Sequence, residues 1–152
     1  MMTVWFFLYI LFIVAPISTF IHELGHVFGA KTVKAENITL SIGLGRKLMT
    51  IPFKRFQLTI HAFFFLGGFV RNKRSVPFDQ WEIIRITIFG PLNNGLFAII
   101  FYGIHQFLPN DYILVLLFFN LWLAIVNIIP FKLWGRDGFI IFKEISEGLH
   151  KT

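Results

Sequence analysis

The sequence predicts an α-helical membrane protein with a core of three transmembrane helices and a short β-strand region between the first and second helices. Hydrophobic residues make up 56% of the chain and 21 of the 152 residues are Phe, which is too apolar for an ordinary soluble domain of this length. Three apolar segments, at about residues 4–30, 81–108 and 112–131, are long enough to cross a hydrocarbon core of about 30 Å. We expect residues 1–152 to form a single integral membrane domain.

The positive charge of the chain lies beside the predicted membrane segments. The net charge is +6, and nine of the fourteen Lys and Arg residues fall between Lys31 and Arg74. Because basic residues accumulate in cytoplasmic loops, membrane topology explains this charge better than nucleic-acid binding does. The turn at residues 109–111 has no Lys or Arg, which places it outside. The sequence therefore predicts a multi-pass protein of the cell membrane whose N-terminus is outside and whose C-terminus is cytoplasmic.

Strand periodicity occurs only between the first two helices, at about residues 36–70. Apolar and polar or small residues alternate over 38–44 and again over 56–62, which predicts two to four short strands. The segment from Phe63 to Val70 is too short to span a bilayer and is broken by glycines, so we expect it to dip into the membrane interface.

His22, Glu23 and His26 form an H-E-x-x-H motif inside the first apolar segment. On a helix, residues four apart lie one turn above each other, so both imidazoles can bind one metal ion. A zinc ion with two His ligands, a third protein ligand and an open position lowers the pKa of its water to about 7, and a neighbouring carboxylate can take the proton. The motif therefore predicts a Zn²⁺ site with Glu23 as general base. A purely structural role is disfavoured, because ionisable residues at such depth usually face an interior, a cavity or a partner.

The third metal ligand is expected at the cytoplasmic end of the third helix or just beyond it. The two histidines lie late in the first helix, and the first and third helices run in the same direction. Asp137 is favoured because Gly138 frees the backbone to turn beside it. Glu144 and Glu147 are alternatives, although residues 138–149 have the pattern of an amphipathic helix whose acids face water. His61 is a further candidate in the strand region, where a lone His is more often structural.

Small and amide side chains mark the faces on which the helices should pack. Asn120 and Asn127 share one face of the third helix and should point inward, since lipid penalises exposed amides. Small side chains let membrane helices approach closely. Four such residues lie on the histidine face of the first helix: Ala15, Ser18, Gly25 and Gly29.

Six short elements follow one another along the chain: H-E-L-G-H at 22–26, S-I-G-L-G-R at 41–46, L-G-G-F-V at 66–70, G-P-x-x-N at 90–94, N-I-I-P at 127–130 and D-G at 137–138. Taken in this order, they resemble the site-2 protease family of intramembrane zinc metalloproteases, and the resemblance covers nearly the whole chain. Six residues separate Pro130 from Asp137, whereas the commonest family pattern has four.

The resemblance implies a zinc-dependent endopeptidase that cuts a transmembrane protein or peptide substrate within the lipid bilayer. It implies that Asp137 is the third zinc ligand and that Asn94 and Asn127 contact the substrate backbone or hold it open. Two other kinds of protein remain: a non-catalytic membrane binder or immunity protein that retains the protease fold, and a helical scaffold without metal. The intact Glu23 favours the protease, because neither alternative needs that carboxylate.

Overall fold

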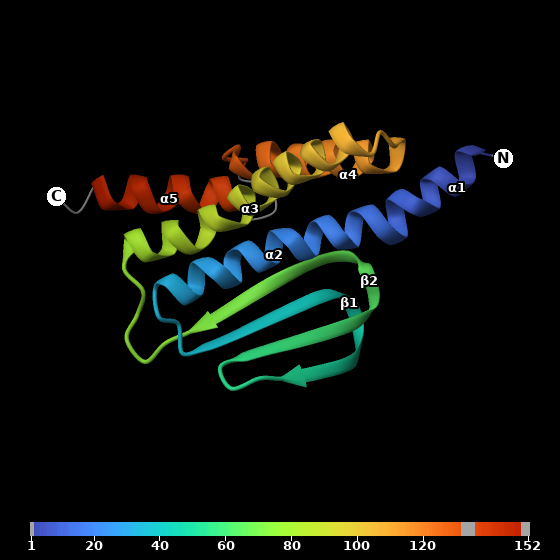
Figure 1. Ribbon diagram of the computed structural model, residues 1–152. Helices are drawn as coiled ribbons and strands as arrows, with labels where there is room; N and C mark the ends of the chain where they lie inside the picture. Colours follow the sequence, from blue (N-terminus) through green and yellow to red (C-terminus); the bar gives the residue numbers. More distant parts are fainter. Residues whose placement is uncertain (1, 132–135, 150–152) are drawn as a thin grey trace.

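The computed structural model describes residues 2–131 and 136–149 and shows a layer of helices beside a β-sheet (Figure 1). Helix α2 is the helix that faces the sheet; the sheet lies on one side of it, and α3, α4 and α5 lie on the other (Figure 1). The elements in chain order are α1 (Met2–Tyr9), the π-helical turn η1 (Ile10–Val14), α2 (Ala15–Thr32), β1 (Asn37–Pro52), β2 (Phe56–Lys73), α3 (Gln80–Phe107), α4 (Asp111–Ile128) and α5 (Asp137–Leu149).

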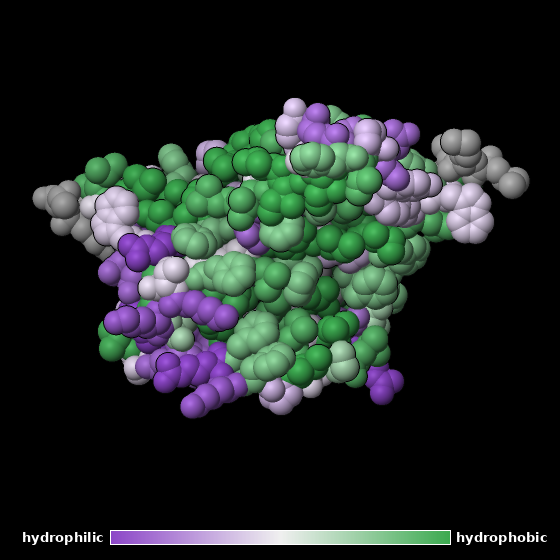
Figure 2. Space-filling view, in the orientation of Figure 1, coloured by the Kyte–Doolittle hydropathy of each residue, from purple (hydrophilic) through white to green (hydrophobic). Residues whose placement is uncertain are grey.

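Three helical segments of the described chain are long and apolar enough to cross a membrane: Val4–Thr32, Gln80–Phe107 and Asp111–Ile128. These correspond to the three expected helices. Large hydrophobic side chains cover much of the face over the helices, whereas hydrophilic ones gather around the β2–α3 connection and the neighbouring hairpin (Figure 2). The molecule thus has an apolar surface of the kind that a bilayer would cover.

Two of the three long helical segments differ from the expectation, the first by an internal π-turn and the third by an earlier end. The first helix contains the π-turn η1, in which the Ala15 N–H bonds to the Ile10 carbonyl, and Pro16 follows with no N–H to donate. The third helix was expected to reach residue 131 but ends at Ile128. Ile129 is extended, with φ −70° and ψ 128°, because Pro130 disfavours the helical conformation of the residue before it.

The sheet has two strands, the lower limit of the expectation, but both are much longer than expected. β1 has 16 residues and β2 has 18, and they pair antiparallel. Residues 38–42 lie opposite 68–72 and also opposite 56–60, while residues 49–52 lie opposite 57–60. The segment from Phe63 to Val70, expected as a separate interfacial segment, is part of β2. Gly43 and Gly67, with φ of 84° and 73°, allow each strand to continue through a sharp bend.

The sheet is anchored to α2 through a small apolar core. Leu40 is completely buried, and Val27 and Ala30 of α2 are 2% and 0% exposed. The members of this core are Val27, Ala30, Ala35, Ile38, Leu40 and Ile42. Because the same helix carries the H-E-x-x-H motif, this packing fixes the sheet relative to the motif.

Candidate metal centre

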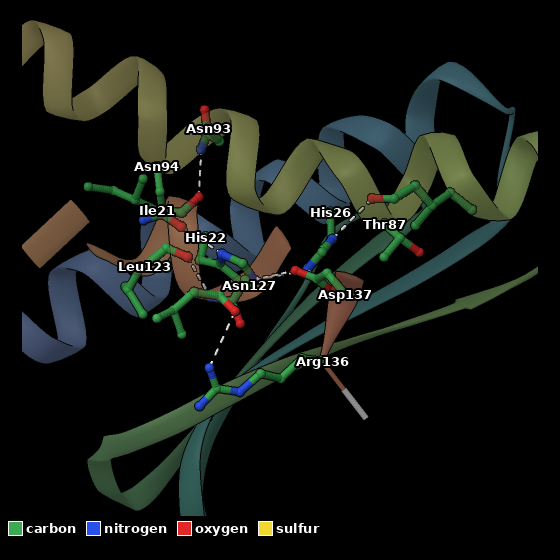
Figure 3. A network of polar contacts seen from close by, with 12 residues as sticks. Ile21, His22, His26, Thr87, Asn93, Asn94, Leu123, Asn127, Arg136 and Asp137 are labelled. Carbon is green, nitrogen blue, oxygen red and sulfur yellow. Dashed lines mark hydrogen bonds and ion pairs between the residues drawn. The ribbon is translucent and has the colours of Figure 1, made fainter. Parts of the chain in front are cut away.

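His22 and His26 of α2 and Asp137 of α5 point toward one another (Figure 3). The His22 Nε2 atom lies 3.0 Å from Asp137 Oδ2, and the His26 Nε2 atom lies 3.3 Å from Asp137 Oδ1. The two Nε2 atoms are 3.2 Å apart. Among the described residues, these three are the group whose ligand atoms could hold a metal ion, all within 4.8 Å of one another. Two imidazoles and one carboxylate match a catalytic zinc site that keeps an open position.

The second nitrogen of each imidazole is hydrogen-bonded in a way that fixes its tautomer. His22 Nδ1 lies 2.6 Å from Asn94 Oδ1, and His26 Nδ1 lies 3.0 Å from the Ile86 carbonyl oxygen. Both partners are acceptors, so each Nδ1 donates its hydrogen. With Nδ1 as the donor, a neutral ring has its Nε2 lone pair free for a metal, which is the usual arrangement around metal-binding histidines.

Asn94 is itself held in one orientation by hydrogen bonds. Its side chain is fully buried, and its Nδ2 donates to the Ser18 carbonyl at 3.1 Å and to Asn120 Oδ1 at 2.8 Å. Asn120 in turn donates to Ser18 Oγ at 2.9 Å, which confirms that Asn120 points inward. The structure therefore places Asn94 behind His22, within a polar network between α2, α3 and α4. Its contact with a substrate stays a prediction.

Asp137 begins α5 and reaches the histidines despite the six-residue separation from Pro130; residues 132–135 lie outside the described residues. Burial would raise the pKa of Asp137, but the adjacent imidazoles of His22 and His26 outweigh burial and lower the pKa from its ordinary value. The carboxylate is thus kept in the ionised form that a metal ligand requires. A side chain at Gly138 would collide with the Ile128 carbonyl, so glycine is needed for this close return of the chain to α4.

Glycines also allow α2 and α3 to meet at the site. A Cβ at Gly25 would collide with the Phe89 carbonyl, and one at Gly29 would lie 2.8 Å from Ile86 Cα. A Cβ at Gly90 would lie 2.6 Å from His26 Nε2. The small-residue face of the first helix therefore packs against α3 as predicted, and Gly90 leaves the space that the imidazoles occupy.

Glu23 lies beside this centre and is 7% exposed. Its Oε2 atom is buried and has no hydrogen-bond partner among the described residues. β2 passes close to it, because a Cβ on Gly68 would lie 3.0 Å from Glu23 Cγ. A buried carboxylate oxygen with a free acceptor position, next to a metal site, is placed to take a proton from water.

A cavity of about 380 Å³ adjoins Glu23 and His22. Asn127 lines it, and its Nδ2 donates to the Leu123 carbonyl at 2.9 Å, so the amide is held at the wall of the cavity. Its contact with substrate also stays a prediction. The full lining is Thr19, His22, Glu23, Gly67, Gly68, Trp122, Leu123, Val126, Asn127 and Arg136.

The other candidate ligands lie apart from the three-residue group. His61 Nδ1 lies 3.3 Å from the Ile42 carbonyl within the sheet. Glu147 pairs with Lys143 at 3.6 Å on the exposed side of α5, and Glu144 is absent from the metal-binding group. Sequence reasoning missed the support of His26 by the Ile86 carbonyl and the presence of Arg136 at the cavity. A backbone carbonyl such as that of Ile86 cannot be recognised from the sequence, whereas Arg136 could have been noted as a basic residue directly before Asp137.

Comparison with known proteins shows the family of the chain. No curated protein matches the chain. The sequence model of Peptidase family M50 matches residues 6–111, more than half of the chain and including the H-E-x-x-H motif and Asn94. The chain therefore belongs to Peptidase family M50, the site-2 protease family.

Proposed function

We propose that this protein is a zinc-dependent intramembrane endopeptidase that hydrolyses a peptide bond in or near a transmembrane segment of another membrane protein. The observation that carries the proposal is the position of Glu23, whose buried and unpartnered Oε2 lies beside the group formed by His22, His26 and Asp137. Membership of a peptidase family supports the reaction class.

The donor set fits zinc. The two Nε2 atoms and the Asp137 carboxylate would hold the ion, and when bound it would supply Lewis acidity and a water of lowered pKa. Asp137 Oδ2 is buried 3.0 Å from His22 Nε2, so these two candidate ligand atoms already lie side by side. Asn94 and the Ile86 carbonyl orient the imidazoles.

The role of Glu23 follows from its place at the cavity. Its carboxylate takes a proton from the attacking water and later passes it to the leaving amine. The cavity beside it is of the size typical of ligand sites, about 300–1,000 Å³, and would receive the peptide bond. Asn127, at the wall of that cavity, would hydrogen-bond the substrate backbone.

The substrate must be locally extended, because the peptide groups of a helix are already hydrogen-bonded to one another. β2 is suited to hold such a segment. In the described pairing, residues 68–72 lie opposite 38–42, and Gly68 of this stretch lies beside Glu23. If the extended substrate segment paired with the other edge of residues 68–72, its backbone hydrogen bonds would be satisfied and its peptide bond would lie near the general base.

The test is cleavage of a single-span substrate by the purified protein in lipid vesicles. Glu23→Gln should retain zinc and its melting temperature but lose about 10²- to 10⁴-fold in rate, the usual contribution of a general base. Glu147→Gln is the matched control, because Glu147 is an exposed acid on α5, and its activity should equal that of the wild type. Undiminished cleavage by Glu23→Gln would show that the proposed role of this residue is wrong.

A further inference from the structure

Arg136 places a positive charge at the cavity beside Glu23. Its Nη1 lies 3.4 Å from the Val126 carbonyl, longer than the 2.7–3.2 Å of a good N–H···O hydrogen bond. No ion pair joins Arg136 to an acid within residues 2–131 and 136–149. Most of its five N–H donors therefore have no acceptor among the described residues.

Arg74 shows how a structural arginine is held in the same protein. Its guanidinium donates to both carboxylate oxygens of Glu82, at 2.8 and 2.6 Å, and to the Val33 carbonyl at 2.8 Å. Further bonds reach the carbonyls of Val76 and Pro77. Within the described part of the chain Arg136 has no comparable set of partners, so a role in holding these residues together explains it poorly.

Arg136 is partly exposed and lines this cavity without an ion-pair partner among the described residues, so its guanidinium is accessible to a charged ligand. The planar guanidinium fits a carboxylate through two parallel hydrogen bonds. The other charged group lining the cavity is Glu23, which forms no ion pair with Arg136 and stands beside the metal-binding group. The missing counter-charge can therefore be brought by the substrate.

We propose that Arg136 is a specificity residue that binds the carboxylate of an Asp or Glu in the substrate, close to the bond that is cut. This inference rests on the proposed peptidase function and names the class of substrate. Figure 3 shows the Arg136 side chain reaching back toward the end of α4, whereas the neighbouring Asp137 faces the histidines. Because the Arg136 side chain points away from the metal-binding group, it is better placed to bind a side chain of the substrate than to contact the carbonyl group that is attacked. Asn127 lines the same cavity and can add an amide contact.

The experiment compares substrates that differ only by Asp or Asn at successive positions on both sides of the cleaved bond. At one of these positions, the wild type should show kcat/KM for Asp at least about 10-fold above that for Asn, as a charge-assisted pair implies. In Arg136→Gln this ratio should fall to near one, and Arg136→Glu should prefer Lys at that position. Lys143→Gln, which alters an exposed cation on α5, should keep the wild-type ratio.

Binding provides a second readout that does not depend on turnover. In the Glu23→Gln background, the Asp substrate should cross-link to the protein more strongly than the Asn substrate, and adding Arg136→Gln should abolish this difference. Zinc content and melting temperature of each variant check that it is folded. Cleavage by Glu23→Gln as fast as by the wild type would overturn the proposed function, yet the binding comparison would still be readable. The role of Arg136 would be overturned if the wild type had an Asp-to-Asn ratio of kcat/KM near one, or if Arg136→Gln left that ratio unchanged. It would also be overturned if Arg136→Gln lowered kcat/KM equally for both substrates, because Arg136 would then support the transition state or the fold.

Discussion

Substituting Gly90 by Ala should disturb the metal centre without removing any ligand. The added methyl carbon would lie 2.6 Å from His26 Nε2 and 3.0 Å from His22 Cε1. Because non-bonded heavy atoms prefer about 3.5–4.0 Å, the His26 ring would have to move by roughly 1 Å. Separating α2 from α3 to make room would break the close packing of Gly25 against Phe89.

The expected effect of Gly90→Ala is a weaker zinc site. Overpacking costs about 1–3 kcal/mol, which corresponds to roughly 5- to 150-fold in Kd. Metal-ligand distances tolerate only about 0.2 Å of error, so a shift of about 1 Å cannot be absorbed within the coordination sphere. The assay is competition for zinc between the purified protein and a fluorescent chelator.

Gly95→Ala is the matched control on the same helix. A Cβ at Gly95 meets nothing within 4 Å, and Ala favours a helix over Gly by about 1 kcal/mol, so zinc affinity should be unchanged and thermal stability equal or higher. Wild-type zinc affinity in Gly90→Ala would refute the reasoning, and so would equal weakening by both substitutions.

Two further predictions concern the support of His22 and the orientation of the chain. Asn94→Ala should weaken zinc binding about 10- to 100-fold, because it deletes the acceptor for His22 Nδ1, and this is the usual effect of removing the partner of a metal-binding histidine. The same competition assay measures the zinc affinity, and an unchanged affinity would contradict the role assigned to Asn94. The chain has no cysteine, so a single Cys can be introduced at exposed Asn110 or at exposed Lys54. A membrane-impermeant thiol reagent added outside should label the Cys at position 110 and not the one at position 54. The reverse pattern would contradict the predicted orientation.

The helices could be predicted because their signals are local. Apolar length marks three segments, and four-residue spacing brings His22 and His26 onto one helical face. Helix ends were less certain, as the early stop of α4 before Pro130 shows. The bends at Gly43 and Gly67 that turn short apparent strands into two long ones depend on positive φ values, which alternation of residue types does not reveal.

The site could be predicted only in part because its members come from distant segments. Asp137 was preferred to Glu144 and Glu147, and the structure brings Asp137 to both histidines. Asn94 was identified as functional by resemblance, but its position behind His22 depends on the packing of α3 against α2 at Gly25 and Gly90. The contact of the Ile86 carbonyl with His26 depends on the same packing and has no side-chain signature.

The central claim is that His22, His26 and Asp137, distant in sequence, form one zinc site. Zinc stoichiometry of purified Asp137→Ala, compared with Glu144→Ala and Glu147→Ala, tests it most directly. We expect Asp137→Ala to bind substoichiometric zinc and to lose activity, because one of three protein ligands is removed. The wild type and the two glutamate variants should each bind one zinc per chain. Full zinc occupancy in Asp137→Ala together with loss in Glu144→Ala or Glu147→Ala would contradict the account.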